Sequence, residues 1–173
     1  MTMTNKIENI NPNTLFIGKK IIYLPNCHST NDSALSILGS NDVFEGTTIV
    51  TSKQTSGKGQ KGNQWQSEPG KNLTFSIILK PDFLDVKEQF KLNFAVSLGI
   101  FDFLSSFFKS HVKIKWPNDI YYKDSKIAGI LIENSIRSMK MQYSIVGVGL
   151  NVNQEAPLSP ELVKRGIGET EKR

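Results

Sequence analysis

The chain has 173 residues, with 21 lysines and arginines against 16 aspartates and glutamates, a net charge of +5 and a single cysteine. This length fits one compact domain with a short tail, and one cysteine excludes both an internal disulfide and a thiolate-rich zinc site. No stretch approaches the roughly 18–20 uncharged apolar residues of a membrane span, and the polar start has no apolar segment typical of a secretory signal. We therefore expect a cytoplasmic protein. Its lysines are scattered, which gives no reason to expect nucleic-acid binding.

The first half of the chain predicts short strands around one short helix. Residues 1–19 are polar and predict a flexible arm. In chain order we then expect a strand over 20–24, a helix over 34–38 capped by residues 29–32 and ended by Gly39, a strand over 46–51, a polar glycine-rich loop over 52–71 and a strand over 73–79.

The second half predicts one long helix followed by strands. Residues 86–108 carry apolar side chains on two sides of a helix, a pattern typical of a buried central helix. Strands are expected over 112–116, 120–122, 126–132 and 143–152, and their short connections favour antiparallel pairing. The predicted fold class is therefore α+β, with a mixed, mostly antiparallel sheet flanked by helices.

A glycine-rich loop, Gly57-Lys58-Gly59-Gln60-Lys61-Gly62, has the spacing G-x-G-x-x-G. A dinucleotide-binding turn would need a helix to begin there and an acidic residue about 20 positions later, and neither is predicted. Asn63 after the last glycine also excludes a P-loop. Glycines and lysines in such a loop can still surround a phosphate or close over a nucleotide, and a flexible exposed loop remains the alternative.

Three further segments are candidate parts of a site. Lys115-Trp116-Pro117-Asn118-Asp119 offers an amide and a carboxylate after a strand, although a plain turn has the same composition. Lys126 precedes an apolar strand, where a fixed cation can stabilise charge on a phosphate or carboxylate, or can simply be solvated. Gly147 and Gly149 lie two apart on a predicted strand and therefore face the same side, which suggests close approach of a ligand or another backbone. His28, His111 and Cys27 form no metal-ligand or catalytic-triad pattern.

The order of these segments resembles the catalytic domain of biotin protein ligases over roughly residues 20–153. The segments are Ser29-Thr30-Asn31, Gln54 to Trp65, Asn72 to Ser76, Lys115 to Asp119, Lys126 to Glu133 and Gly147 to Asn153. The resemblance implies a fold similar to class II aminoacyl-tRNA synthetases. It also implies a two-step reaction, in which biotin and ATP form biotinyl-5′-adenylate and the biotin then passes to a lysine of a biotin carboxyl carrier protein or domain. Mg²⁺ would be held mainly through the phosphates, and a homodimer is a candidate assembly.

The resemblance also implies roles for individual residues. Lys126 would contact the biotin carboxylate and the phosphate, Asp119 would lie near the reacting centre, and Lys58 would join them as the third catalytic residue. The biotin-binding residues would be Ser29, Thr30, Asn31, Gln54, Gly57, Lys58, Gln60, Lys126, Gly129, Leu131 and Gly147. The nucleotide-binding residues would be Lys58, Lys61, Trp65, Lys115, Asn118, Gly149 and Asn151. No residue would bind a metal directly.

The sequence departs from the family pattern in two places. Lys58 and Gln60 stand where the family usually has arginines, so the bidentate guanidinium is absent at both positions. After Asn153 the family usually continues with helices, an adenine wall and a small β domain, whereas residues 156–173 predict a polar tail. We therefore expect residues 20–155 to be a C-terminally truncated catalytic domain without a DNA-binding helix-turn-helix before it or a membrane partner. A non-catalytic biotin- or adenylate-binding module and a lipoate or octanoate attachment enzyme remain alternatives.

Overall fold

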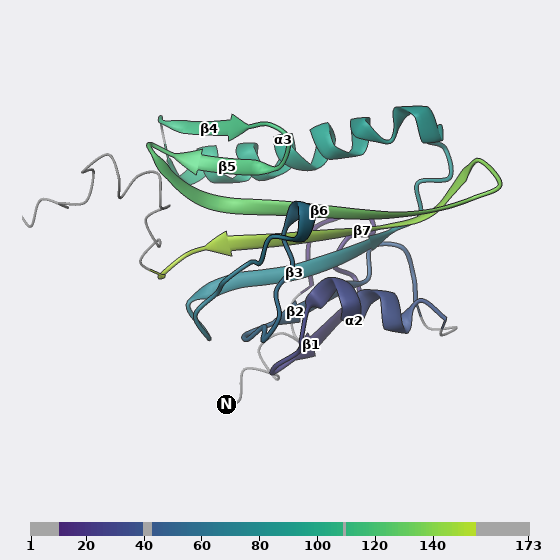
Figure 1. Cartoon of the computed structure of the whole chain (residues 1–173), viewed down its shortest axis with the longest axis horizontal. Coiled ribbons are helices and arrows are strands. Elements are labelled where there is room, and N and C mark those ends of the chain that lie inside the picture. Colours follow the sequence, from purple (N-terminus) through teal and green to yellow (C-terminus); the bar gives the residue numbers. More distant parts are fainter. Residues whose placement is uncertain (1–10, 40–42, 109, 155–173) are drawn as a thin grey trace, which may run out of the picture.

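The strands form a single seven-stranded sheet in the order β1-β2-β3-β7-β6-β5-β4 (Figure 1). The computed structural model describes residues 11–39, 43–108 and 110–154. The strands are β1 (Ile21–Leu24), β2 (Thr48–Thr51), β3 (Asn72–Leu79), β4 (Val112–Lys115), β5 (Asp119–Tyr122), β6 (Ser125–Arg137) and β7 (Lys140–Asn151). Only β1 and β2 pair in parallel, and every other pair is antiparallel. The predicted α+β class with a mostly antiparallel sheet is confirmed.

The two central strands are longer than the sequence predicts. Polar residues between 133 and 142 interrupt the apolar pattern, but β6 and β7 continue to pair as far as Arg137 and Lys140. They form a long hairpin that extends beyond the other strands (Figure 1). Backbone hydrogen bonds between the two strands maintain the pairing in the part of the hairpin where few side chains are buried.

The tip of this hairpin places two residues with side chains in the left-handed region. Ser138 has φ of 51° and Met139 has φ of 60°. A left-handed residue with a Cβ costs roughly 1–2 kcal/mol, and glycine gives back roughly 0.5–1 kcal/mol through its extra chain entropy. Met139→Gly is therefore expected to raise the free energy of unfolding by about 0.5–1 kcal/mol in urea titrations. The matched control is Lys140→Gly, at the next residue, where φ is negative and glycine should destabilise. Equal losses in both variants would contradict this account of the turn.

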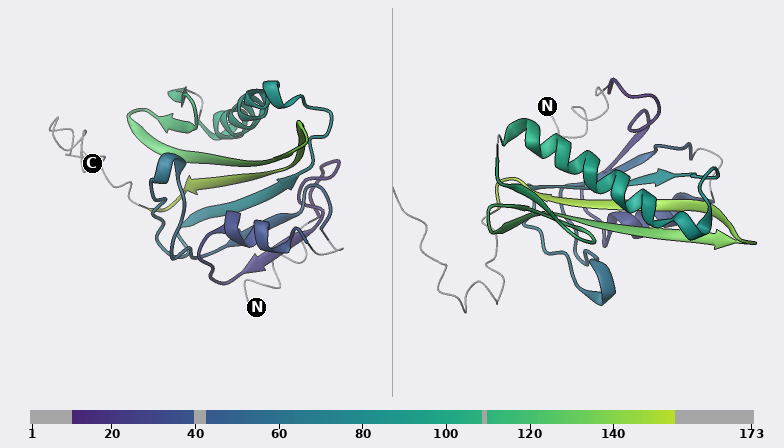
Figure 2. Two further views of the ribbon diagram at one scale, coloured as in Figure 1. Left: turned by 45° about the vertical axis from the view of Figure 1, so that its right-hand side comes forward. Right: turned by 90° about the horizontal axis from the view of Figure 1, so that it is seen from above.

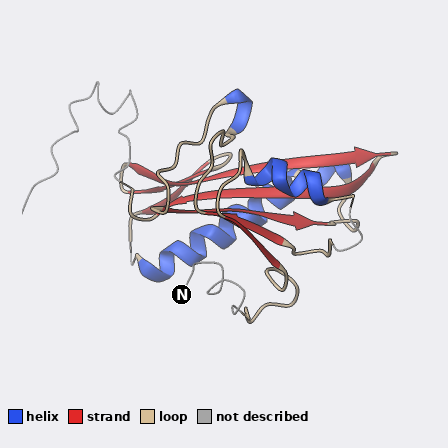
Figure 3. Cartoon of the chain, turned by 90° about the horizontal axis from the view of Figure 1, so that it is seen from below, coloured by secondary structure: helices blue, strands red, loops and turns tan. Residues whose placement is uncertain are grey.

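The two helices cover opposite faces of the sheet (Figures 2 and 3). Helix α2 (Thr30–Ile37) packs on β2, β3 and β7, while α3 (Phe90–Phe107) packs on β4 and β5. Two short 3₁₀ turns, η1 (Gln60–Gly62) and η2 (Val86–Glu88), complete the helical elements among the described residues.

Alternation along β7 separates the two cores. Ile145 joins the core under α2, which also contains Ala34, Ile49 and Ile78. Leu150 joins the core under α3, which also contains Leu104, Ile120, Ala128 and Ile130. Because side chains alternate along a strand, the odd-numbered positions 147 and 149 lie on the α2 side. The candidate glycines thus face α2 and not α3.

The prediction that α3 is a buried central helix is wrong. Among its residues with described burial, only Ser97 and Leu104 are buried, whereas Phe90, Phe94, Leu98, Phe103 and Phe107 are exposed. The helix contacts the sheet along one stripe, and no described element lies on its outer side (Figure 2). Its length and hydropathy would suffice for a membrane span. However, the chain is attached to the sheet both before and after this helix. Asp85, just before η2, forms a bridge with Lys140 of β7, and β4 pairs with β5.

The predicted boundaries at residues 19 and 155 are not tested by the fold. Residues 11–20 form bends and turns, and the Gly18 amide donates to the Gly46 carbonyl at 2.9 Å. The rest of the predicted arm, residues 1–10, and the predicted tail, residues 156–173, lie outside the described residues.

Candidate functional site

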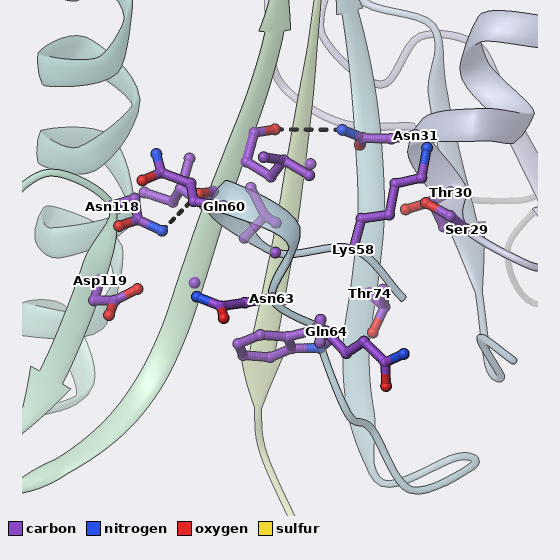
Figure 4. A pocket seen from close by; sticks show the side chains of 18 of the residues that line it. Ser29, Thr30, Asn31, Lys58, Gln60, Asn63, Gln64, Thr74, Asn118 and Asp119 are labelled. Carbon is purple, nitrogen blue, oxygen red and sulfur yellow. Dashed lines mark hydrogen bonds between the residues drawn. The ribbon is translucent and has the colours of Figure 1, made fainter. Parts of the chain in front are cut away.

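A pocket of about 220 Å³ lies on the α2 side of the sheet, beneath the glycine-rich loop (Figure 4). Ser29, Thr30 and Asn31 at the start of α2 form one side, and Asn118 and Asp119 form the other. Loop residues including Gln60 and Asn63 lie between them. No α-helix was predicted to begin in this loop, and the structure has only the 3₁₀ turn η1 there.

The floor of the pocket is a pair of neighbouring strands with glycines in register. Gly149 pairs with Gly129, and Gly147 pairs with Leu131. A methyl group built on Gly147 would lie 2.3 Å from Asn31 Oδ1, well inside van der Waals contact. The sequence predicts close approach of a ligand or another backbone at these glycines. The groups that approach them in the structure are side chains of this protein, chiefly those of Asn31 and Trp65.

A hydrogen-bonded polar cluster closes the α2 end of the pocket. Gln54 Oε1 accepts from the Thr30 amide at 2.7 Å and lies 3.2 Å from the Thr30 hydroxyl. The Ser76 hydroxyl donates to Asn31 Oδ1 at 2.6 Å and lies 2.7 Å from Thr30 Oγ1. A hydroxyl has one proton, and Ser76 gives its proton to the Asn31 oxygen, which can only accept. The Thr30 hydroxyl is therefore the donor in its contact with Ser76. Asn31 also donates to Glu133 at 2.7 Å.

Ser29 leaves its side chain available to the pocket. It has extended backbone angles at the start of α2, as a capping residue should, but its hydroxyl forms no capping hydrogen bond. The predicted cap is therefore wrong in its chemistry. Ser29 is 2% exposed and lines the pocket instead.

Ser76, which the sequence analysis did not select, is the hub of this cluster. It is fully buried on β3, and Ser76→Ala would leave Asn31 Oδ1 without its donor. We expect Ser76→Ala to lower the free energy of unfolding by about 1–3 kcal/mol in urea titrations. Ser144→Ala is the matched control, because Ser144 is equally buried on β7 but its hydroxyl has no hydrogen-bond partner among the described residues. Equal effects of the two substitutions would show that the cluster contributes nothing specific.

The opposite end of the pocket holds an ion pair between Lys126 and Asp119. Lys126 Nζ lies 2.7 Å from Asp119 Oδ1, and the two side chains are 36% and 20% exposed. Two amides fix the surrounding backbone. Asn118 donates to the Ile130 carbonyl at 3.2 Å, and Asn151 donates to the Lys126 carbonyl at 3.1 Å. A cation is thus held at the pocket wall by rigid strands.

A second ion pair fastens the loop to α2. Lys58 contacts Asp32 in the first turn of α2, and this hydrogen bond raises the pKa of Lys58. Because the pKa of Lys58 is raised, its ammonium form persists to higher pH and is lost only as the pH rises through that pKa. Both side chains are nearly half exposed, so the pair positions the loop and adds little stability.

Most of the predicted site residues meet in this one pocket. Those that line it are Ser29, Thr30, Asn31, Gln54, Lys58, Gln60, Lys61, Trp65, Asn118, Asp119, Lys126, Gly129, Leu131, Gly147 and Gly149. Gly57 and Asn151 do not line the pocket, but they bind two residues that do. The Gly57 carbonyl accepts from the Trp65 amide, and the Asn151 amide donates to the Lys126 carbonyl.

Lys115 is not brought into the pocket. Lys115 lies on the edge strand β4, and its ammonium is 5.3 Å from the Tyr121 ring of the neighbouring strand β5. Four residues at or near the site were not predicted from the sequence: Thr74, Ser76, Asp32 and Glu133. Thr74 and Ser76 did leave a signal, since together with Asn72 they are the alternate polar positions in a strand whose other residues are apolar.

The described ranges contain no group of three or more His, Cys, Asp or Glu side chains that could hold a metal ion.

Comparison with known proteins identifies the family. The model of the biotin/lipoate A/B protein ligase family matches residues 23–151. The bifunctional ligase/repressor BirA of Bacillus subtilis is 32% identical over 151 residues, covering 87% of this chain and 46% of that protein. Biotin–protein ligase 2 of Arabidopsis thaliana is 34% identical over 145 residues, covering 81% and 43%. The chain spans about half the length of the curated relatives it matches.

Solved structures show the same fold. The biotin protein ligase from Aquifex aeolicus in complex with biotin and ATP superposes with a TM-score of 0.64 at 31% identity, covering 90% of this chain and 64% of that chain. The Helicobacter pylori biotin acetyl coenzyme A carboxylase synthetase with bound biotinylated ATP gives a TM-score of 0.60 at 28% identity, covering 85% and 70%.

Proposed function

Because the chain belongs to the biotin/lipoate A/B protein ligase family, we propose that its pocket binds biotin and ATP and joins them as biotinyl-5′-adenylate. The observation that carries the proposal is the polarity of the pocket. Uncharged hydrogen-bonding groups gather at the α2 end, where Lys58 is paired with Asp32. Lys126 stands at the β5 end, with a glycine floor between the two ends. Such a pocket fits a ligand with a neutral polar head and an anionic tail.

The neutral end suits the ureido ring of biotin. Gln54 Oε1 is occupied by Thr30, which leaves its amide NH₂ to donate to a ligand carbonyl. The Ser29 hydroxyl lines the same end of the pocket. The similarity of the fold to class II aminoacyl-tRNA synthetases, which the sequence resemblance implies, also remains a prediction.

The charged end suits the reacting groups. An oxygen of the biotin carboxylate attacks the α-phosphorus of ATP, a C–O–P bond forms, and the bond between the α-phosphorus and the bridging oxygen breaks. The electron pair of that bond leaves with pyrophosphate. The two reactants are both anions, so the ammonium of Lys126 offsets their repulsion and the charge that develops on the phosphoryl oxygens. Asp119 positions Lys126 through their 2.7 Å ion pair.

The second step would complete the ligase reaction. The amine of an acceptor lysine on a biotin carboxyl carrier domain attacks the acyl carbon of the adenylate, and AMP leaves. Mg²⁺ is a partner of the ATP phosphates in this scheme and needs no protein carboxylate of its own. A homodimer and a cytoplasmic location are part of the same proposal.

Mass spectrometry of the product tests the first step. The chain is incubated with MgATP and biotin, and in parallel with MgATP and lipoate. Biotinyl-5′-adenylate in the first mixture, with little lipoyl-adenylate in the second, is the expected result. Predominant lipoyl-adenylate would favour the lipoate attachment alternative. Biotin binding without any adenylate would favour a non-catalytic binding module.

A further inference from the structure

Three glycines that the sequence analysis assigned to ligand binding all adjoin Trp65. A methyl group built on Gly149 would lie 2.2–2.5 Å from Cε2, Cζ2 and Nε1 of the indole. One built on Gly129 would lie 2.7 Å from Cζ3 and 3.2 Å from Cε3. One built on Gly57 would lie 2.4 Å from the Trp65 carbonyl oxygen. Real Cβ atoms do not come within 3.0 Å of such neighbours.

These distances define how the indole lies. Opposite edges of its six-membered ring lie over Gly129 and Gly149, which are paired residues on β6 and β7. The ring therefore extends across both strands with one side against the sheet. The Trp65 amide donates to the Gly57 carbonyl at 2.9 Å, which holds the main chain of the same residue. We call Gly129 and Gly149 the indole seat.

The indole lies beside the part of the pocket in which the reaction is proposed. Trp65 lines the pocket, and Lys126 Nζ lies 5.5 Å from the ring centroid. The indole Nε1 is buried and has no hydrogen-bond partner among the described residues, so packing on the seat and not a polar contact fixes the ring. An aromatic side chain held in this way offers a stacking surface worth roughly 1–3 kcal/mol per base.

We propose that Gly129 and Gly149 are positioning residues that act on the nucleotide through Trp65, by letting the indole lie against the sheet, and do not act by touching the ligand. The nucleotide part of this inference rests on the function proposed above. The seat itself is a property of the ligand-free protein. Because Trp65 stands on a loop, a methyl group on the seat should displace the indole and leave the strands in place.

Tryptophan fluorescence tests the seat without any ligand. Trp116→Phe is the parent, because the chain has two tryptophans and Trp116 lines a separate apolar hollow on the α3 side. Adding Gly149→Ala should shift the Trp65 emission to longer wavelength and increase acrylamide quenching. The matched control is Gly147→Ala, on the same strand and the same side, whose methyl group would meet Asn31 and not Trp65. Unchanged emission in Gly149→Ala, or an equal shift in Gly147→Ala, would overturn the proposal.

A double-mutant cycle tests whether the seat acts through Trp65. In the Trp65 background, Gly149→Ala should weaken ATP binding by about 5- to 100-fold, the share that a stacked base contributes. In the Trp65→Ala background the same substitution should have almost no effect. Equal losses in both backgrounds would show direct ligand contact and overturn the proposal. Tighter ATP binding by Trp65→Ala would overturn it too, since the indole would then occupy the place of the ligand.

Two results separate this inference from other failures. If the unsubstituted protein binds no ATP, the proposed function fails, while the fluorescence comparison still decides whether the seat exists. If Gly149→Ala does not fold, the double variant with Trp65→Ala should fold, because the colliding ring is gone. Failure of the double variant as well would show that something other than the indole excludes the methyl group, and would overturn the proposal.

Discussion

Replacement of Lys126 by methionine is expected to slow biotinyl-5′-adenylate formation by about 10²–10³-fold, while biotin binding weakens far less. The ammonium lies beside Asp119 at the charged end of the pocket, where charge develops on the phosphoryl oxygens as the new bond forms. Methionine keeps most of the length of the side chain and removes the charge. Single-turnover formation of the adenylate, with biotin affinity measured separately by calorimetry, gives the two quantities.

Lys123→Met is the matched control for this change. Lys123 lies only three residues away, in the turn between β5 and β6, and its ammonium is near the Tyr122 ring and outside the pocket. It should leave the rate nearly unchanged. Equal losses in the two variants would mean that general positive charge, and not the placement of Lys126, supports the reaction.

Replacement of Gln54 by alanine is expected to weaken biotin binding by about 10- to 100-fold, which corresponds to roughly 1–3 kcal/mol for an unmade buried hydrogen bond. The change removes the amide donors that face the ligand. It also leaves the Thr30 amide, which is buried at the start of α2, without its acceptor. Calorimetric titration with biotin measures the effect.

Gln142→Ala controls for loss of a glutamine side chain. Gln142 is exposed on β7 and lies outside the pocket. The Gln142→Ala variant should bind biotin as tightly as the unsubstituted protein does. Normal biotin binding by Gln54→Ala would contradict the proposal that the polar end of the pocket binds biotin.

The elements that the sequence predicts well are those in which local pattern and burial agree. Strands β2 and β3 have β-branched and apolar residues, and the structure places both within a residue or two of the prediction. The helix predicted over 86–108 is present as α3 (Phe90–Phe107) after the 3₁₀ turn η2, but its burial was predicted wrongly. Two apolar sides indicate what a helix could bury, whereas only the surrounding elements determine what it does bury.

Site residues were predictable where motif and strand geometry agree. Gly147 and Gly149 had to share a face, and the structure confirms that they do. Lys115 lies in a segment that borders the site, but its own ammonium lies near the Tyr121 ring of the neighbouring strand β5, which spacing alone does not reveal. Asp32 and Glu133 become relevant only through Lys58 and Asn31, their partners from other elements. Such contacts between distant segments, like that of Trp65 with the indole seat, depend on the tertiary arrangement.

The central claim is that this pocket activates biotin with ATP. Biotin-dependent exchange of labelled pyrophosphate into ATP measures that step directly, because exchange requires the adenylate to form and to revert. We expect exchange that depends on biotin and is lost in Lys126→Met but kept in Lys123→Met. A folded protein that binds biotin yet shows no exchange above background would contradict it.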